Sequence, residues 1–163
     1  MSVDCSTSMN KDRISLLTQL VGAALNELYL RDYYLLDHKV HERSIVFRFA
    51  HYLQNLLDEH EDFWEYDLDV EYNRNGYSPK RIPGRDNGAE PDVIIHKRGN
   101  NTHNLLAIEF KTYWNSETSD DLKKLKEFTR KGGEYHFSLG LSIALGRNRG
   151  SVDIISVRNG EIN

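Results

Sequence analysis

Cysteine is almost absent from this chain of 163 residues, which contains only Cys5. A single cysteine excludes an intrachain disulfide and a cysteine-ligated metal cluster. The seven histidines do not have the spacing of a zinc site either. The sequence also lacks a P-loop, a dinucleotide-binding fingerprint and a GxSxG motif. The classes of protein that depend on these motifs are therefore not indicated.

Long hydrophobic runs are missing as well, since the longest fall far short of the about 20 residues that span a bilayer. The first twelve residues lack the basic and apolar regions of a signal peptide. We therefore expect a cytoplasmic protein that does not associate with a membrane. With 39% hydrophobic and 28% charged residues, the composition is that of a soluble globular protein. We expect one domain over residues 1–163, with a disordered leader (1–10) and a folded core (11–163).

An excess of positive charge is also missing, because the net charge is −4. The charge is uneven along the chain, however. Residues 1–72 contain 6 Lys and Arg against 14 Asp and Glu, whereas residues 73–163 contain 15 against 11. The second part could therefore follow a phosphate backbone locally.

Two β-rich segments, residues 93–95 and 105–110, are separated by the sequence Gly-Asn-Asn-Thr at residues 99–102. Such a turn between apolar runs predicts a β-hairpin. A turn that closes symmetrically about its two asparagines places Asp92 directly across from Glu109. A shift of one residue would move Asp92 to the opposite face, so this prediction depends on the register of the hairpin.

Three ionisable side chains then meet at one end of this apolar hairpin. Because side chains alternate along a strand, Lys111 shares a face with Glu109 and therefore lies near Asp92. One interpretation is an ion network at the end of two surface strands. The other is a site for a hard cation such as Mg²⁺, which binds proteins through one or two carboxylates together with water and phosphate. The apolar runs predict central strands, where unpaired charge is costly, and favour the second interpretation.

The pattern of Pro91-Asp92 followed by Glu109-x-Lys111, placed on two consecutive strands, resembles the PD-(D/E)xK nuclease superfamily. Over about residues 40–145 the chain also resembles small bacterial proteins of this superfamily, through the segments 41–43 and 71–74. The resemblance implies the restriction-endonuclease-like fold. The order of the expected elements agrees with it and predicts an α/β protein, a three-layer α/β/α sandwich around a mixed sheet of about five strands. These elements are helices 11–31, 40–57 and 120–131, the hairpin, and strands 66–72, 136–145 and 152–157.

The resemblance further implies a site for Mg²⁺ or Mn²⁺ held by Asp92, Glu109 and the carbonyl of Phe110. Lys111 would then orient the attacking water and stabilise charge on the phosphorus. Acting as a base would require a lowered lysine pKa, whereas two nearby carboxylates should raise it, so we expect an electrostatic role. In the superfamily an acidic residue on a preceding helix often joins the metal ligands, and Glu42 occupies that place.

Two acidic residues remain open candidates for that last carboxylate. Glu42 falls in line with the apolar stripe of its helix, but a glutamate at a helix N-terminus also has a purely structural explanation in the helix dipole. Glu71, at the end of a predicted strand, is the second candidate, and it has an equally plain interpretation as an exposed residue.

Basic residues suggest where nucleic acid would bind, although each could also be an ordinary solvated side chain. The loop over residues 75–90 is long enough to indicate a functional flap. The candidates are Arg48 on the second helix and Arg74, Lys80, Arg81 and Arg85 in or before the loop. We expect the last helix to begin with Ser119 as N-cap and to direct its lysines, Lys124 among them, outward or toward its end.

These observations predict a metal-dependent phosphodiesterase that acts on nucleic acid, with DNA as the expected substrate and endonucleolytic cleavage as the expected reaction. A homodimer is one arrangement by which such a protein cuts two strands. The alternatives are a catalytically silent member of the fold that binds DNA, and a protein-interaction module whose acidic first half is the interface.

Overall fold

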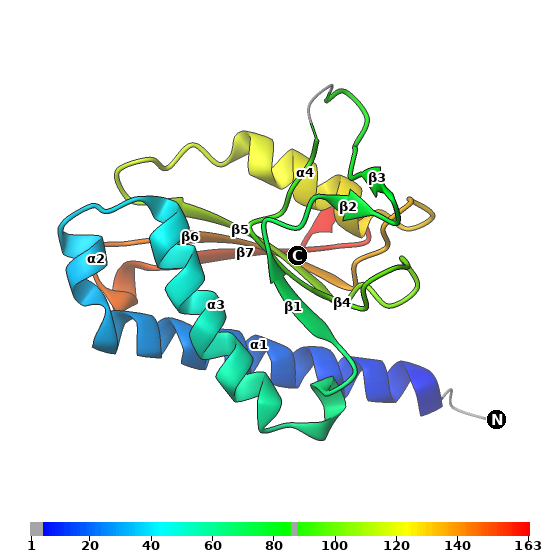
Figure 1. The fold of residues 1–163 in the computed structure, drawn as a ribbon, viewed down its shortest axis with the longest axis horizontal. Coiled ribbons are helices and arrows are strands. Elements are labelled where there is room, and N and C mark those ends of the chain that lie inside the picture. The colour runs from blue at the N-terminus through cyan, green and yellow to red at the C-terminus, as the bar shows by residue number, and fades with distance from the viewer. Residues whose placement is uncertain (1–4, 86–87) are drawn as a thin grey trace.

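The protein is organised around one mixed sheet of six strands (Figure 1), in a computed structural model that describes residues 5–85 and 88–163. The order of the strands is β1-β4-β5-β6-β7-β8. Their bounds are Asp67–Val70, Val93–His96, Leu106–Thr112, Leu139–Leu145, Asp153–Arg158 and Glu161–Ile162. Only β5 and β6 pair in parallel, and the other neighbours are antiparallel. The α/β class and the mixed sheet are confirmed. The sheet has one strand more than expected, because the last residues form the short strand β8 beside β7.

Four α-helices lie in the described part of the chain. They are α1 (Cys5–Arg31), α2 (Tyr33–Asp37), α3 (Glu42–Asp58) and α4 (Ser119–Thr129), and the short 3-10 helices are η1 (Glu61–Phe63) and η2 (Arg149–Ser151). The helix α1 begins well before residue 11, so residues 5–10 of the expected leader continue it, while residues 1–4 lie outside the described residues. Thr118, and not Ser119, takes the N-cap position of α4. None of the helices within the described ranges combines the length and apolar character needed to cross a membrane.

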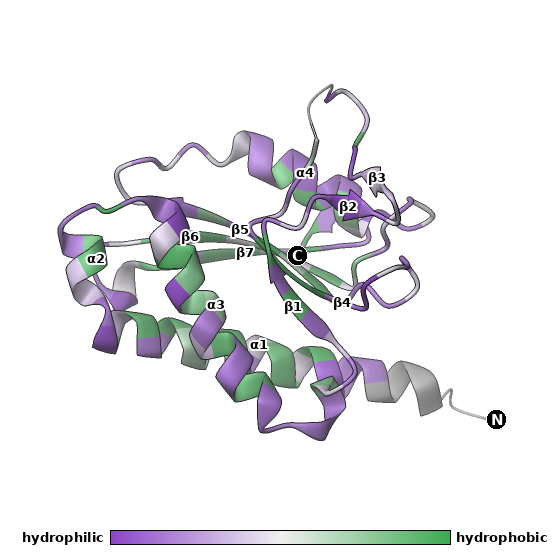
Figure 2. Cartoon of the chain, in the orientation of Figure 1, coloured by the Kyte–Doolittle hydropathy of each residue, from purple (hydrophilic) through white to green (hydrophobic). Residues whose placement is uncertain are grey.

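The sheet is covered by helices on both faces. Figure 1 shows α1 and α3 on one side and α4 on the other. Alternate residues of β5 explain this arrangement, because Ile108 and Phe110 pack toward α1 and α3 while Ala107 packs with Leu125 and Phe128 of α4. In Figure 2 the central strands are largely hydrophobic, as expected for a sheet buried on both faces. Glu109 alternates with Ile108 and Phe110, so it faces α4.

The hairpin has the predicted register. Val93 pairs with Ile108, and Ile95 pairs with Leu106, which is the pairing given by a turn symmetric about residues 100 and 101. On the other edge of β4, the short strand β1 pairs with it in antiparallel fashion. The next position of the β4–β5 register would set Asp92 beside Glu109.

The loop between β1 and β4 contains a small two-stranded hairpin, β2 (Arg74–Asn75) with β3 (Ser78–Pro79). Residues 86–87 of the predicted flap lie outside the described residues. The loop returns to the sheet at Glu90, next to α4, since the Glu90 carbonyl accepts a hydrogen bond from Lys124 Nζ at 3.3 Å. The end of the loop therefore borders the predicted site.

Candidate functional site

The predicted carboxylate pair lies where β4 begins and β5 continues past it. Asp92 Oδ2 accepts a hydrogen bond from the backbone N–H of Phe110 at 2.6 Å. This N–H points toward the β4 side of β5, but it lies past the point where β4 begins. No backbone carbonyl of β4 pairs with it, so the Asp92 carboxylate takes the place of that carbonyl. Since the N–H and C=O of one strand residue point to the same side, the Phe110 carbonyl also faces the side on which Asp92 lies.

Burial raises the pKa of the Asp92 carboxyl group, although the Phe110 N–H and the charges of Lys124 and Lys111 partly offset this effect. The charges of both lysines therefore act on Asp92.

Glu109 is almost completely buried, with 2% of its surface exposed. Burial, followed by the charge of Asp92, raises the pKa of Glu109 to about 8, and Lys124 opposes this shift. Lys124 Nζ lies 2.7 Å from Glu109 Oε1. The two atoms form a buried ion pair, so the Lys124 ammonium occupies this oxygen of the motif glutamate.

Lys111 lies on the same face of β5 and pairs with a second residue of α4. Its Nζ is 3.1 Å from Oδ2 of Asp121, which is buried. Burial lowers the pKa of Lys111, but the contact with Asp121 and the charges of Glu42 and Asp92 outweigh it, so the pKa is raised on balance. This is the direction expected from the sequence. A lysine with a raised pKa stays protonated and acts through its charge and its hydrogen bonds.

The structure separates the two candidates for the remaining carboxylate. Glu42, at the first position of α3, is half-buried, and its Oε2 has no hydrogen-bond partner in the described structure. Burial raises the Glu42 pKa, the charge of Lys111 lowers it, and the charge of Asp92 raises it further. Glu71 instead directs its carboxylate to Arg43, at 2.6 Å. Glu42 thus belongs to the cluster around Asp92 and Lys111, whereas Glu71 belongs to a surface ion pair.

The site predicted from the sequence did not include Asp121 and Lys124, and the expectation that Lys124 points outward is wrong. A helical spacing could have revealed them. Asp121, Lys124, Leu125 and Phe128 stand at positions i, i+3, i+4 and i+7 and are all buried. Six charged residues therefore meet between β5, α4 and the first turn of α3: Glu42, Asp92, Glu109, Lys111, Asp121 and Lys124.

Of the basic residues expected to contact nucleic acid, Lys80 has the least suitable position. Only 2% of its surface is exposed, and Nζ donates a hydrogen bond to the Arg74 carbonyl at 2.8 Å. Its ammonium also lies 5.0 Å from the centre of the Tyr72 ring and 5.4 Å from that of Tyr135. This placement contradicts a role as a surface residue of the flap, because the two rings and the carbonyl enclose the charge.

The remaining basic candidates are either paired or placed on the outer surface. Arg85 forms an ion pair with Asp120 at the start of α4. Arg74 and Arg81 are exposed, although the Arg81 backbone N–H is bound by the hydroxyl of Tyr135 at 2.8 Å.

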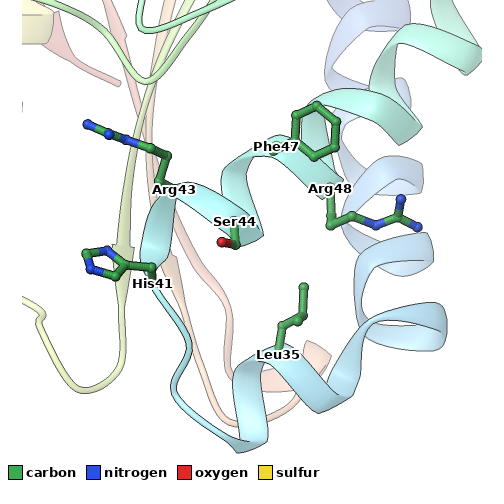
Figure 3. A pocket seen from close by; sticks show the side chains of 6 residues that line it. All are labelled: Leu35, His41, Arg43, Ser44, Phe47 and Arg48. Carbon is green, nitrogen blue, oxygen red and sulfur yellow. The ribbon is translucent and has the colours of Figure 1, made fainter.

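Arg48 lies on the outer side of α3, with Nε 2.8 Å from Asp32 Oδ2. Arg48 borders an open hollow along α3 (Figure 3). The volume of this hollow is about 670 Å³, and the Phe47 side chain within it is 60% exposed. The hollow is lined by Leu35, His41, Arg43, Ser44, Phe47 and Arg48.

A dedicated metal cage is not formed in the described ranges, since no three His, Cys, Asp or Glu side chains are grouped to hold an ion. Mg²⁺ does not require such a cage, because it binds proteins through one or two carboxylates and keeps water and phosphate ligands. Asp92 and Glu109 supply that number. Glu42 Oε2 is a buried carboxylate oxygen with no hydrogen-bond partner in the structure as described, whereas Glu109 Oε1 and Asp121 Oδ2 face the ammonium groups of Lys124 and Lys111. The donor set therefore suits a cation held by two carboxylates and completed by other ligands.

Comparison with known proteins adds no relative to this arrangement. No protein-family model, no curated protein and no solved structure matches the chain. The resemblance to the PD-(D/E)xK superfamily accordingly rests on the motif and on the positions of its residues.

Proposed function

We propose that this chain is a metal-dependent phosphodiesterase of the PD-(D/E)xK superfamily with a restriction-endonuclease-like fold, acting as an endonuclease on nucleic acid, with DNA as the substrate. One observation carries the proposal. The hairpin register brings Asp92 beside the buried Glu109, with Lys111 on the same face of β5 as Glu109. Two carboxylates so placed repel each other when both are ionised, and a bound cation would offset that repulsion.

Each residue has a role that follows from its surroundings. Asp92, Glu109 and the Phe110 carbonyl would hold Mg²⁺ or Mn²⁺, which polarises the scissile phosphate and lowers the pKa of a bound water. Lys111, kept protonated beside Asp121, would donate hydrogen bonds to the phosphate and stabilise the negative charge that develops there. Glu42 has an unpartnered oxygen with which to orient the attacking water. The resemblance implies products with a 5′-phosphate and a 3′-hydroxyl.

A specific observation supports a second candidate, a silent module that binds DNA or protein without cleaving it. The ion pairs Glu109–Lys124 and Lys111–Asp121 neutralise much of the site without any metal. A site balanced in this way could be retained for stability alone. Cleavage activity decides between the two candidates.

The experiment is cleavage of plasmid, single-stranded and branched DNA in Mg²⁺ or Mn²⁺ by the wild type and by Asp92→Asn. The asparagine keeps an oxygen to accept the Phe110 N–H but loses the negative charge, so the fold should persist. We expect the wild type to cleave at least one substrate and the variant to lose about 10²-fold or more of the rate. Asp153→Asn, an equal change at an exposed position of β7, should cleave at the wild-type rate.

Two results would contradict the proposal. Equal cleavage by the wild type and Asp92→Asn would place the activity at another site or in a contaminant. If the folded wild type cleaves none of the substrates, including RNA, the silent module becomes the better explanation.

A further inference from the structure

Two charged residues of α4 are opposite in sign to the charged residues of β5 that they contact. Glu109 and Lys111 lie two positions apart on the strand, while Asp121 and Lys124 lie three positions apart on the helix. Lys124 Nζ is 2.7 Å from Glu109 Oε1, and Asp121 Oδ2 is 3.1 Å from Lys111 Nζ. The helix α4 therefore places a charge of opposite sign beside each of the two motif residues on β5, Glu109 and Lys111.

The ion pair between Glu109 and Lys124 is buried. Glu109 exposes 2% of its surface and Lys124 exposes 7%. A long lysine side chain is seldom buried unless its charge is compensated. The Lys124 ammonium also donates to the Glu90 carbonyl at 3.3 Å, so it is held between a carboxyl oxygen and a backbone carbonyl oxygen. It is a fixed positive charge at the place where the carboxylates would attract a metal ion.

We infer that Lys124 is an internal counter-ion that competes with a divalent cation for Glu109. The inference rests on the proposed metal site. A cation that takes Glu109 Oε1 as a ligand must displace the ammonium from its 2.7 Å contact or bind beside a like charge, and both cost free energy. Lys124 thus weakens metal binding and keeps Glu109 compensated when no metal is bound.

The test measures binding of Mn²⁺ alone, at neutral pH, from the loss of the electron paramagnetic resonance signal of free Mn²⁺. Lys124→Gln removes the charge but keeps an N–H donor for Glu109. We expect this variant to bind Mn²⁺ tighter than the wild type by a factor on the order of ten, because a like charge has been removed. Lys124→Arg keeps the charge and should bind as the wild type does. Lys123→Gln makes the same change of net charge at the exposed neighbouring position and should have no effect.

Three results would overturn the inference. The first is equal or weaker Mn²⁺ binding by Lys124→Gln. The second is the same gain in Lys123→Gln, which would reduce the effect to net charge. The third is a gain that survives the addition of Asp92→Asn, which would place the ion elsewhere. If Lys124→Gln does not fold, Lys124→Met carries the same expectation with a side chain of similar length.

The proposed function and this inference fail in different ways. Cleavage by the wild type together with unchanged Mn²⁺ affinity in Lys124→Gln would overturn the inference and leave the nuclease in place. Tighter binding by Lys124→Gln without cleavage by any variant would support the inference and contradict the nuclease.

Discussion

The ammonium group of Lys80 is enclosed by two tyrosine rings and bound by the Arg74 carbonyl. Tyr72 comes just before the β2–β3 hairpin, and Tyr135 lies between α4 and β6. The Lys80 side chain therefore connects the loop to the segment that leads into β6. Burial lowers the pKa of Lys80 to about 8, although the charges of Asp69 and Glu134 oppose the shift. The lysine that was expected on the surface thus has a measurable structural role.

A lowered lysine pKa makes stability depend on pH in a defined direction. Between about pH 8 and the ordinary value of 10.5, the unfolded chain binds more protons at this position than the folded protein. The contribution of Lys80 to the free energy of unfolding therefore rises with pH across that window. We expect Lys80→Met to remove this rise, on the order of 3 kcal/mol, in urea unfolding followed at several pH values. Exposed Lys126→Met should keep the wild-type pH dependence.

The pH dependence of Lys80→Met also tests whether the two tyrosine rings stabilise the protonated form of Lys80. Parallel curves for wild type and variant would mean that the rings of Tyr72 and Tyr135 keep the ammonium protonated, since such contacts favour the cation. The lowered pKa would then be contradicted while the contacts remain.

At the scale of the element, α4 brings two residues of the charged cluster to β5 through its apolar anchors. Phe128 is fully buried, with its ring centre 5.2 Å from that of Tyr135 and 6.0 Å from that of Phe137. Leu122, the residue next to Asp121, is only partly buried. The helix is therefore turned so that Asp121 faces the sheet more fully than Leu122.

This orientation gives a stability prediction. Phe128→Ala should lower the free energy of unfolding by about 3–5 kcal/mol, because it removes a fully buried ring from a packed core. Leu122→Ala should cost about 1 kcal/mol, as expected for a partly exposed position. Both values can be measured by urea unfolding of the purified variants. Equal losses at the two positions would contradict the orientation of α4 and, with it, the burial of Asp121.

The contrast between the hairpin and α4 shows what the sequence could predict. The register that pairs Val93 with Ile108 follows from local information, since a short symmetric turn joins two β-rich segments. The burial of Lys124 does not, because it depends on a carboxylate that lies on another element. Lys80 is a similar case, as Tyr72 and Tyr135 are far apart in the sequence. Hydrophobic periodicity assigns apolar residues to a core but is silent on charged residues that find partners there.

At the scale of the whole molecule, the uneven charge along the chain does not by itself produce the nucleic-acid contact surface expected from the sequence. Three of the five basic candidates are engaged within the protein, since Arg48 pairs with Asp32, Arg85 pairs with Asp120 and Lys80 is buried. Arg74 and Arg81 remain exposed, on the loop that returns to the site at Glu90. A contact with a phosphate backbone through these candidates would therefore depend on two residues of that loop.

The salt dependence of DNA binding tests this reduced footprint. Each phosphate contact that is lost lowers the magnitude of the negative slope of log K against log salt concentration by about 1. The double variant Arg74→Ala/Arg81→Ala should therefore lower this magnitude by about 2 and weaken binding to all sequences alike. Arg48→Ala removes one positive charge at a paired position and should leave the magnitude of the slope unchanged. Fluorescence anisotropy of a labelled duplex in metal-free buffer separates binding from cleavage. An unchanged slope in the double variant would place the DNA on another face. A slope of smaller magnitude in Arg48→Ala would mean that Arg48 leaves its ion pair with Asp32 and binds phosphate beside the α3 hollow.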